Sequence, residues 1–153
     1  MITFEFLHAG HEGIDTFDGL GVVAGSKEAA AVLASVKNPG NNIKTALGVY
    51  YHTVGDNKKA LEYLNTATGR KALYYKAWCN SRLKQNDNAL NLWGNLAISG
   101  NSYAASSVTR IANLAKDKGM KEKSIKVLER IVRERRGNVQ ARALQALINL
   151  LGK

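Results

Sequence analysis

A short apolar pattern occurs four times along this chain and constrains its fold more than any other feature. Each copy has a small residue followed by an apolar one, with two more apolar residues three and six places further on. The copies begin at Ala29, Ala60, Ala89 and Ser124. Stacked supersecondary units repeat in this way because none of them can bury its apolar face alone. The pattern therefore predicts an array of repeats and not one closed enzyme core.

The segments before the second and third copies also carry apolar stripes at helical intervals. Turns rich in Gly, Asp and Asn separate each stripe from the copy that follows, which predicts two helix hairpins, at 41–68 and 71–98. Asp56, and either Asn86 or Asp87, are the expected N-caps of the second helices. A third hairpin is expected at 103–136.

The remaining segments complete one predicted domain, residues 1–153. Alternation in the first seven residues predicts a short strand or extended arm within 1–25. A helix over 26–37, with Ser26 as its cap, is interpreted as the second arm of a degenerate first repeat. Residues 138–151, with Asn138 as the N-cap, are expected to form a capping helix. The prediction is an all-α array of about three and a half hairpins.

The first hairpin resembles a tetratricopeptide repeat. The residues that carry the resemblance alternate between small and large, and they are Ala46, Leu47, Gly48, Tyr51, Gly55, Ala60, Leu64 and Ala67. It is good over residues 41–68 and partial in the other hairpins, so the chain is described as a divergent member. The resemblance implies a right-handed solenoid of helical hairpins.

The same resemblance implies a binding groove. In such arrays the first helices of successive hairpins line a concave surface that receives an extended peptide or a helix of a partner protein. Carried over to this chain, the groove consists of Thr45, Val49, His52, Thr53, Lys71, Tyr74, Trp78, Arg82, Thr109, Asn113 and Lys116. The first hypothesis is therefore a non-enzymatic adaptor that binds another protein.

The two tryptophans have different expected roles. Trp93 lies within the repeating apolar pattern and is expected in the core. Trp78 lies off the stripe of its helix, close to Tyr74 and Arg82, which is the composition of an interface hot spot. Packing of Trp78 between hairpins is the alternative interpretation, because neighbouring helices readily bury large aromatic side chains.

Basic charge is concentrated in the third hairpin and its exit. The net charge is +10, and residues 110–142 hold eleven basic and four acidic side chains. Lys123, Lys126, Arg130 and Arg133 share one helical face, which can attract a polyanion or an acidic protein. The alternative function is thus binding of nucleic acid or of an acidic partner through the surface 116–142. A solvated helix with ordinary i,i+4 ion pairs explains the same pattern.

A third and weaker hypothesis is a small metal-dependent enzyme. His8 and His11 lie three residues apart with carboxylates nearby, and imidazole and carboxylate can both bind a divalent ion. The spacing is not specific for a metal site, and no nucleophile elbow or phosphate-binding loop accompanies it. No cofactor is therefore expected.

The cellular location follows from the cysteine and the apolar segments. Cys79 is the single cysteine and has no partner for an internal disulfide, which favours a reduced, cytoplasmic compartment. No apolar run reaches the roughly 20 residues that span a bilayer, and the first residues do not have the order of a signal peptide. A membrane partner is not expected, and the oligomeric state is left open.

Overall fold

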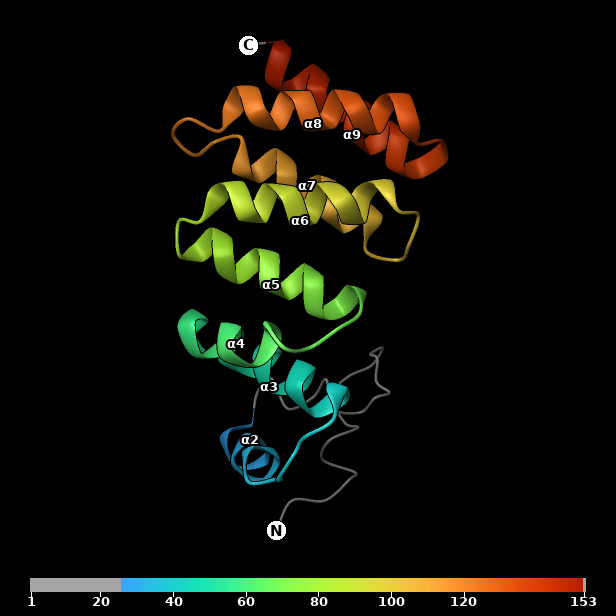
Figure 1. The fold of residues 1–153 in the computed structure, drawn as a ribbon. Helices are drawn as coiled ribbons and strands as arrows, with labels where there is room; N and C mark the ends of the chain where they lie inside the picture. The colour runs from blue at the N-terminus through green and yellow to red at the C-terminus, as the bar shows by residue number, and fades with distance from the viewer. Residues whose placement is uncertain (1–25, 153) are drawn as a thin grey trace. The chain divides into compact units, whose positions relative to one another are not determined.

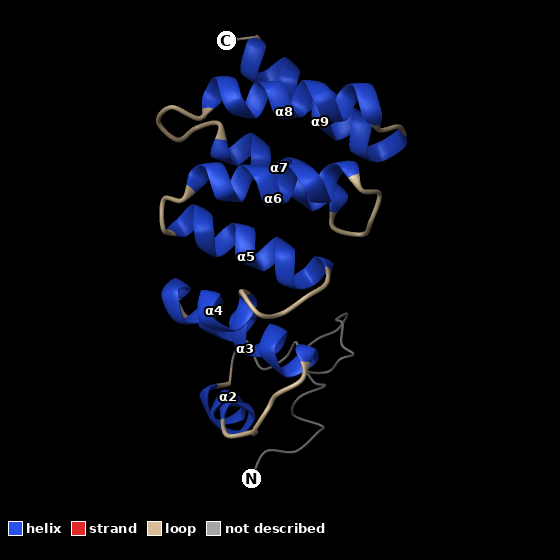
Figure 2. Ribbon diagram, in the orientation of Figure 1, coloured by secondary structure: helices blue, strands red, loops and turns tan. Residues whose placement is uncertain are grey.

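A computed structural model describes residues 26–152. The helices are α2 (Lys27–Ala34), α3 (Asn41–Thr53), α4 (Asn57–Leu64), α5 (Arg70–Arg82), α6 (Asn86–Ile98), α7 (Ala104–Leu114), α8 (Lys121–Glu134) and α9 (Gly137–Leu151). Within the described range the chain has no strand (Figure 2). The all-α prediction is therefore confirmed, while the predicted N-terminal arm lies outside the described residues.

The chain divides into two compact units, one up to Cys79 and one from Asn80 onwards. Helix α5 begins in the first unit and ends in the second (Figure 1). Each unit is a set of helices joined by short turns. The organisation of residues 1–153 as a single domain stays a prediction.

Two predicted N-caps open helices of the first unit. The Ser26 hydroxyl accepts a hydrogen bond from the Ala29 amide over 3.0 Å at the start of α2. The Asp56 carboxylate accepts one from the Lys59 amide over 3.1 Å at the start of α4. Both bonds satisfy an amide that has no partner within its own helix. These two positions were predicted correctly.

The first unit has a core on each side of α3 and α4. Helix α2 packs on α3, with Ala29 and Ala30 against Leu47 and Tyr50. On the other side, α4 and α5 share a second cluster, whose buried members are Ala60, Leu64, Ala72 and Cys79. The small residues of the repeating pattern therefore lie where neighbouring helices approach closely, as packing of successive hairpins requires.

Helices α3 and α4 approach each other closely at Gly48. A Cβ atom placed on Gly48 would overlap the side chain of Leu64, which is buried. Since a larger residue would push the helices apart, glycine is needed here for packing and not for its backbone freedom. The hairpin of 41–68 is thus held by a glycine and a leucine that the repeat pattern singled out.

In the second unit α6, α7, α8 and α9 follow one another as antiparallel neighbours (Figure 1). Helix α7 packs against α6, α8 and α9, and α6 also packs against α8. The largest buried side chains here are apolar and come from all four helices; they include Trp93, Val108, Ile111, Leu128, Ile131 and Leu147. The expected core position of Trp93 is confirmed.

Two predicted helix starts are wrong. Helix α6 begins at Asn86 with Gln85 as its N-cap residue, and α9 begins at Gly137 with Arg136 in that place; neither cap makes a side-chain hydrogen bond. In α6 the cause is Lys84, whose φ is 65°. This left-handed conformation turns the chain before the Asn-Asp-Asn segment, so Gln85 precedes the helix and the segment forms its first turn. In α9 the cause is Gly137, whose φ of 68° starts the helix before Asn138.

Candidate interaction surface

Three of the predicted groove residues meet in the first unit. His52 from α3 lies 4.9 Å from Trp78 of α5 between ring centroids, and Tyr74 lies 5.8 Å from Trp78. Tyr75, which was not predicted to take part, stacks on Trp78 at 6.0 Å and meets His52 at 5.8 Å. We call His52, Tyr74, Tyr75 and Trp78 the aromatic cluster. Contacts of this kind stabilise the pairing of α3 with α5 beyond simple burial.

The packing interpretation of Trp78 is confirmed, whereas its role as an interface hot spot stays a prediction. Its ring packs against neighbouring aromatic rings, yet its side chain is only half-buried. Tyr74 is buried, so of this pair it is Trp78 that offers surface to a partner. A large amphipathic ring held in place by its neighbours loses little conformational entropy on binding.

The side chain of His52 is oriented from two directions. Its Nδ1 lies 2.8 Å from Oδ1 of Asn57 and 3.7 Å from Sγ of Cys79. Because an amide oxygen can only accept, Nδ1 is the donor in the contact with Asn57. The buried thiol of Cys79 lies behind the ring. The Cys79 and His52 pair is thus part of the packing and is not arranged as an exposed nucleophile with its base.

The other predicted residues of the first unit occupy different environments. Thr45 and Val49 are buried in α3, at 8% and 7% exposure. Thr53 is exposed, and its hydroxyl donates to the carbonyl oxygen of Val49 over 2.8 Å. Lys71 is half-buried in α5. Of these four residues only Thr53 and Lys71 present substantial surface.

A hollow of about 220 Å³ lies between α7 and α9 in the second unit. Its lining comes half from each helix and consists of Val108, Thr109, Ala112, Asn113, Arg142, Gln145, Ala146 and Asn149. We call it the α7/α9 groove. Thr109 and Asn113 were predicted to line a groove along the first helices of successive hairpins; both line this hollow, and their part in partner binding stays a prediction. Its floor is apolar and its rim is polar, the combination that fixes both position and orientation of a ligand.

Hydrogen bonds hold the rim of the groove in place. Arg142 Nη1 donates to the hydroxyl of Thr109 over 3.3 Å, which links the two helices. Within α9, the amide of Gln145 donates to the side-chain oxygen of Asn149 over 3.1 Å. Thr109, Arg142, Gln145 and Asn149 are all exposed. The rim therefore offers one cation together with amide donors and acceptors to an incoming group.

Two other predicted groove residues lie elsewhere. Lys116 is exposed just after the end of α7 and does not line the groove. Arg82 is exposed in the last turn of α5, within the second unit, whereas Lys71, Tyr74 and Trp78 belong to the first. That Lys116 and Arg82 belong to the partner-binding groove stays a prediction.

The contribution of α9 to the groove was not predicted, because this helix was expected only to cover the end of the array. The polar residues Asn138, Arg142, Gln145 and Asn149 are spaced four, three and four apart, so they share one helical face. That face is the sequence signal for a groove-lining helix. Helix α9 packs on both α7 and α8, and its role as a capping helix stays a prediction.

Two of the four basic residues predicted to share one face of α8 form ion pairs within the protein. Lys123 Nζ lies 2.9 Å from a carboxylate oxygen of Asp87, and Arg130 Nε lies 2.9 Å from one of Glu134. Lys126 and Arg133 are exposed on the same helix. Because exposed ion pairs are weak, Lys123 and Arg130 can still bind a polyanion. The paired carboxylates nevertheless lower the net positive charge of this face of α8.

His8 and His11 lie outside the described residues. Among residues 26–152, no three His, Cys, Asp or Glu side chains gather where they could hold a metal ion. Every helix of that same range is too short or too polar to cross a membrane.

The fold and the groove together define a helical-repeat protein. A family model of the tetratricopeptide repeat matches residues 42–72, which cover α3 except its first residue, all of α4 and the first three residues of α5. The predicted best match at 41–68 is therefore confirmed, and this stretch is a tetratricopeptide-type repeat. Comparison with curated proteins and with solved structures finds no match. Repeats of this family generally mediate binding of protein partners, and proteins built from them are typically non-enzymatic scaffolds.

Proposed function

We propose that this protein is a non-enzymatic adaptor that binds a peptide or helix of a partner protein along the first helices of its hairpins. The observation that carries the proposal is the α7/α9 groove, a solvent-accessible hollow between α7, the first helix of the third hairpin, and α9, the last described helix. Its floor is apolar and its rim is polar. Concave surfaces of this kind are what stacked hairpins offer a partner.

The size of the groove favours a segment of a protein over a cofactor. Its volume of about 220 Å³ is below the roughly 300 to 1,000 Å³ of sites that enclose a small molecule. A hollow of this size accommodates one or two side chains of a longer ligand. The remainder of that ligand would extend over the exposed rim, where Asn113 and Asn149 can bond to its backbone.

The charge of the rim favours an acidic group at one point of that segment. Arg142 is the one charged side chain of the groove lining, and its guanidinium is exposed while bonded to Thr109. A guanidinium can bond a carboxylate through two parallel hydrogen bonds. In the first unit the half-buried Trp78 supplies an apolar anchor for a partner.

Substitutions on the rim test this proposal. Asn113→Ala combined with Arg142→Ala should weaken capture of protein partners from lysate, since both remove polar atoms from the groove. Asn91→Ala, an exposed asparagine on α6 outside the groove, is the matched control. If the double variant captures the same partners as the wild type, the α7/α9 groove is not the binding site.

The alternative function uses the basic surface 116–142, and its test is separate. Replacing Lys123, Lys126, Arg130 and Arg133 with Ala should abolish nucleic-acid binding, and the wild-type affinity should fall steeply with salt, if this surface binds a polyanion. The adaptor proposal requires instead that capture of protein partners persists after nuclease treatment and in the fourfold variant.

We infer a cytoplasmic location from the single, buried cysteine, because proteins of oxidising compartments more often pair their cysteines. Cell fractionation with an antibody against the protein tests this inference.

A further inference from the structure

Helices α6 and α8 of the second unit pack side by side and run in the same direction (Figure 1). Their register is set by one contact near the start, one in the middle and one at the end of the pair: Asp87 with Lys123, Gly94 with Val127, and Ile98 with Arg135. Residues that border this line of contact on the solvent side therefore form one continuous surface across the two helices.

Two rows of exposed polar side chains border the line. The row on α6 is made of amides and the row on α8 of cations, and in each the residues recur at intervals of three and four, so they share one side of their helix. The rows consist of Asn88, Asn91 and Asn95, and of Lys123, Lys126, Arg130 and Arg133. We call these seven residues the α6/α8 face.

We propose that the α6/α8 face binds single-stranded nucleic acid, with the cations of α8 on phosphates and the asparagines of α6 on bases. Packed helices lie about 8 to 10 Å apart, so the two rows are separated by a distance comparable with that from a phosphate to its base. Lys and Arg bond phosphate oxygens, and an asparagine amide can bond adenine through a donor and an acceptor together. The proposal adds α6 to the basic surface 116–142. It also goes beyond the adaptor function, since neither helix lines the α7/α9 groove.

The chemistry of the face distinguishes this partner from a protein or a membrane. Helices α6 and α8 expose no large apolar side chain along their described length. An acidic protein would need an apolar anchor at the centre of the interface, and a membrane surface would need an apolar helix face to insert. Interfaces with nucleic acid are instead polar and strongly positive. The α6/α8 face has that composition.

The two ion pairs on the face leave donors for phosphates. Arg130 bonds Glu134 through Nε, which is one of the five N–H donors of a guanidinium. The side chains of Lys123 and Arg130 remain 56% and 53% exposed in their pairs. Since the carboxylates already restrain these two cations, they lose less conformational freedom when they bind a phosphate.

The width of the face selects a single strand over a duplex. The major groove of a DNA duplex is about 12 Å wide and admits one helix. Two helices of about 10 to 12 Å diameter, packed side by side, are together about 20 Å wide and do not enter it. Asparagines on such a broad surface reach base edges only where the bases are unpaired.

Fluorescence anisotropy with a labelled RNA of twelve adenines tests the cationic row. The affinity of the wild type should fall with salt, with a slope of log K against log salt concentration between about −2 and −3, as expected for up to four phosphates on a single strand. Lys126→Ala combined with Arg133→Ala should reduce the slope by about 1 to 1.5. Lys37→Ala combined with Lys58→Ala removes the same charge from exposed positions of the first unit and should leave the slope unchanged.

The same probe tests the amide row. Asn91→Ala combined with Asn95→Ala should weaken binding at least about fivefold and leave the salt slope unchanged, because no phosphate contact is lost. Alanine favours a helix more than asparagine does, so weaker binding would not reflect a loss of helix. Asn42→Ala combined with Asn65→Ala, exposed asparagines of the first unit, is the matched control and should bind as the wild type does.

Two further probes identify the nucleic acid. A duplex of the adenine strand with its complement should bind more weakly than the single strand, and the DNA strand of the same sequence shows whether the 2′-hydroxyl contributes. Absence of binding at low salt, equal affinity for the duplex, or unchanged affinity of the Asn91 and Asn95 double variant would overturn the proposal. Capture of protein partners from nuclease-treated lysate tests the adaptor function separately, so either function can fail without the other.

Discussion

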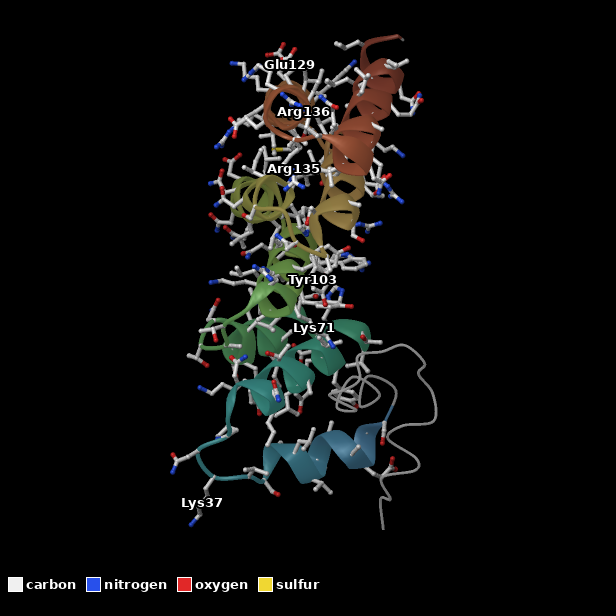
Figure 3. All side chains as sticks on the ribbon, turned by 90° about the vertical axis from the view of Figure 1, so that its right-hand side faces the viewer. Lys37, Lys71, Tyr103, Glu129, Arg135 and Arg136 are labelled. Carbon is white, nitrogen blue, oxygen red and sulfur yellow. The ribbon has the colours of Figure 1, made fainter. Side chains whose placement is uncertain are left out.

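Arg135 Nη1 donates a hydrogen bond to the main-chain carbonyl oxygen of Ile98 over 3.1 Å. The contact joins Arg135, which follows α8 and is labelled in Figure 3, to the last residue of α6. The contact places a cation at the negative, C-terminal end of the α6 dipole. It also gives a hydrogen-bond donor to the Ile98 carbonyl, which has no amide of a following helical turn to bond. Gly100 lies beside this contact, and a Cβ there would lie 2.8 Å from the same nitrogen, so the arginine side chain would have to shift.

Replacing Arg135 with Ala should lower the free energy of unfolding by about 1 to 2 kcal/mol, since it removes a hydrogen bond from a charged donor. Urea denaturation measures the change. Arg133→Ala, on the exposed side of α8, should change stability by less than about 0.5 kcal/mol. Equal losses in the two variants would show that the contact to Ile98 has no special role.

Gly48→Ala should destabilise the first unit by about 1 to 3 kcal/mol, because the added methyl group overlaps Leu64 between α3 and α4. The informative control is the double variant with Leu64→Ala. Removing the leucine side chain makes room for the new methyl group, so the combined loss should be smaller than the sum of the single losses. Strict additivity would mean that the two residues do not touch.

Thr45→Val should stabilise the protein or leave its stability unchanged. The Thr45 hydroxyl is buried and has no hydrogen-bond partner among the described residues, so a methyl group of similar shape removes a desolvation cost. Thr53→Val is the contrast, because the Thr53 hydroxyl bonds the Val49 carbonyl. A loss above about 1 kcal/mol in Thr45→Val would reveal a hydrogen-bond partner for that hydroxyl.

Cys79 should be inert in the folded protein. Its thiol is buried against His52 and the second core cluster of the first unit, so a thiol reagent should modify it only at the rate of unfolding. The colour released by an aromatic disulfide reagent, with and without denaturant, reports this rate. Asn57→Ala should speed the reaction, since it frees the His52 ring that covers the thiol. Rapid labelling of the native chain would contradict the packing described here.

The sequence predicted the helices well because their information is local. The spacing of small and apolar residues marks each packed face, and Ser26 and Asp56 cap the helices they precede. The misplaced starts of α6 and α9 have a local cause as well. Lys84 and Gly137 both adopt left-handed backbone conformations. Glycine adopts this conformation readily, but lysine rarely does, so the sequence gives no warning of the turn at Lys84.

The candidate site was only partly predictable, because it depends on which helices lie side by side. Thr109 and Asn113 were found from the repeat register, whereas Arg142 and Asn149 were missed because α9 had no second arm to identify it as part of a repeat. Trp78 stacks on Tyr75 of the same helix, and the spacing of residues alone does not predict the direction of that ring.

The central claim, that the groove side of the array binds a protein, is tested most directly by site-specific photocrosslinking. A photoreactive phenylalanine analogue would replace Asn113 in the α7/α9 groove or, as the control, Glu129 on the exposed side of α8 (Figure 3). We expect discrete protein adducts from position 113 that survive nuclease treatment and are absent from position 129. Adducts formed only at position 129, or adducts that vanish with nuclease, would contradict the adaptor function.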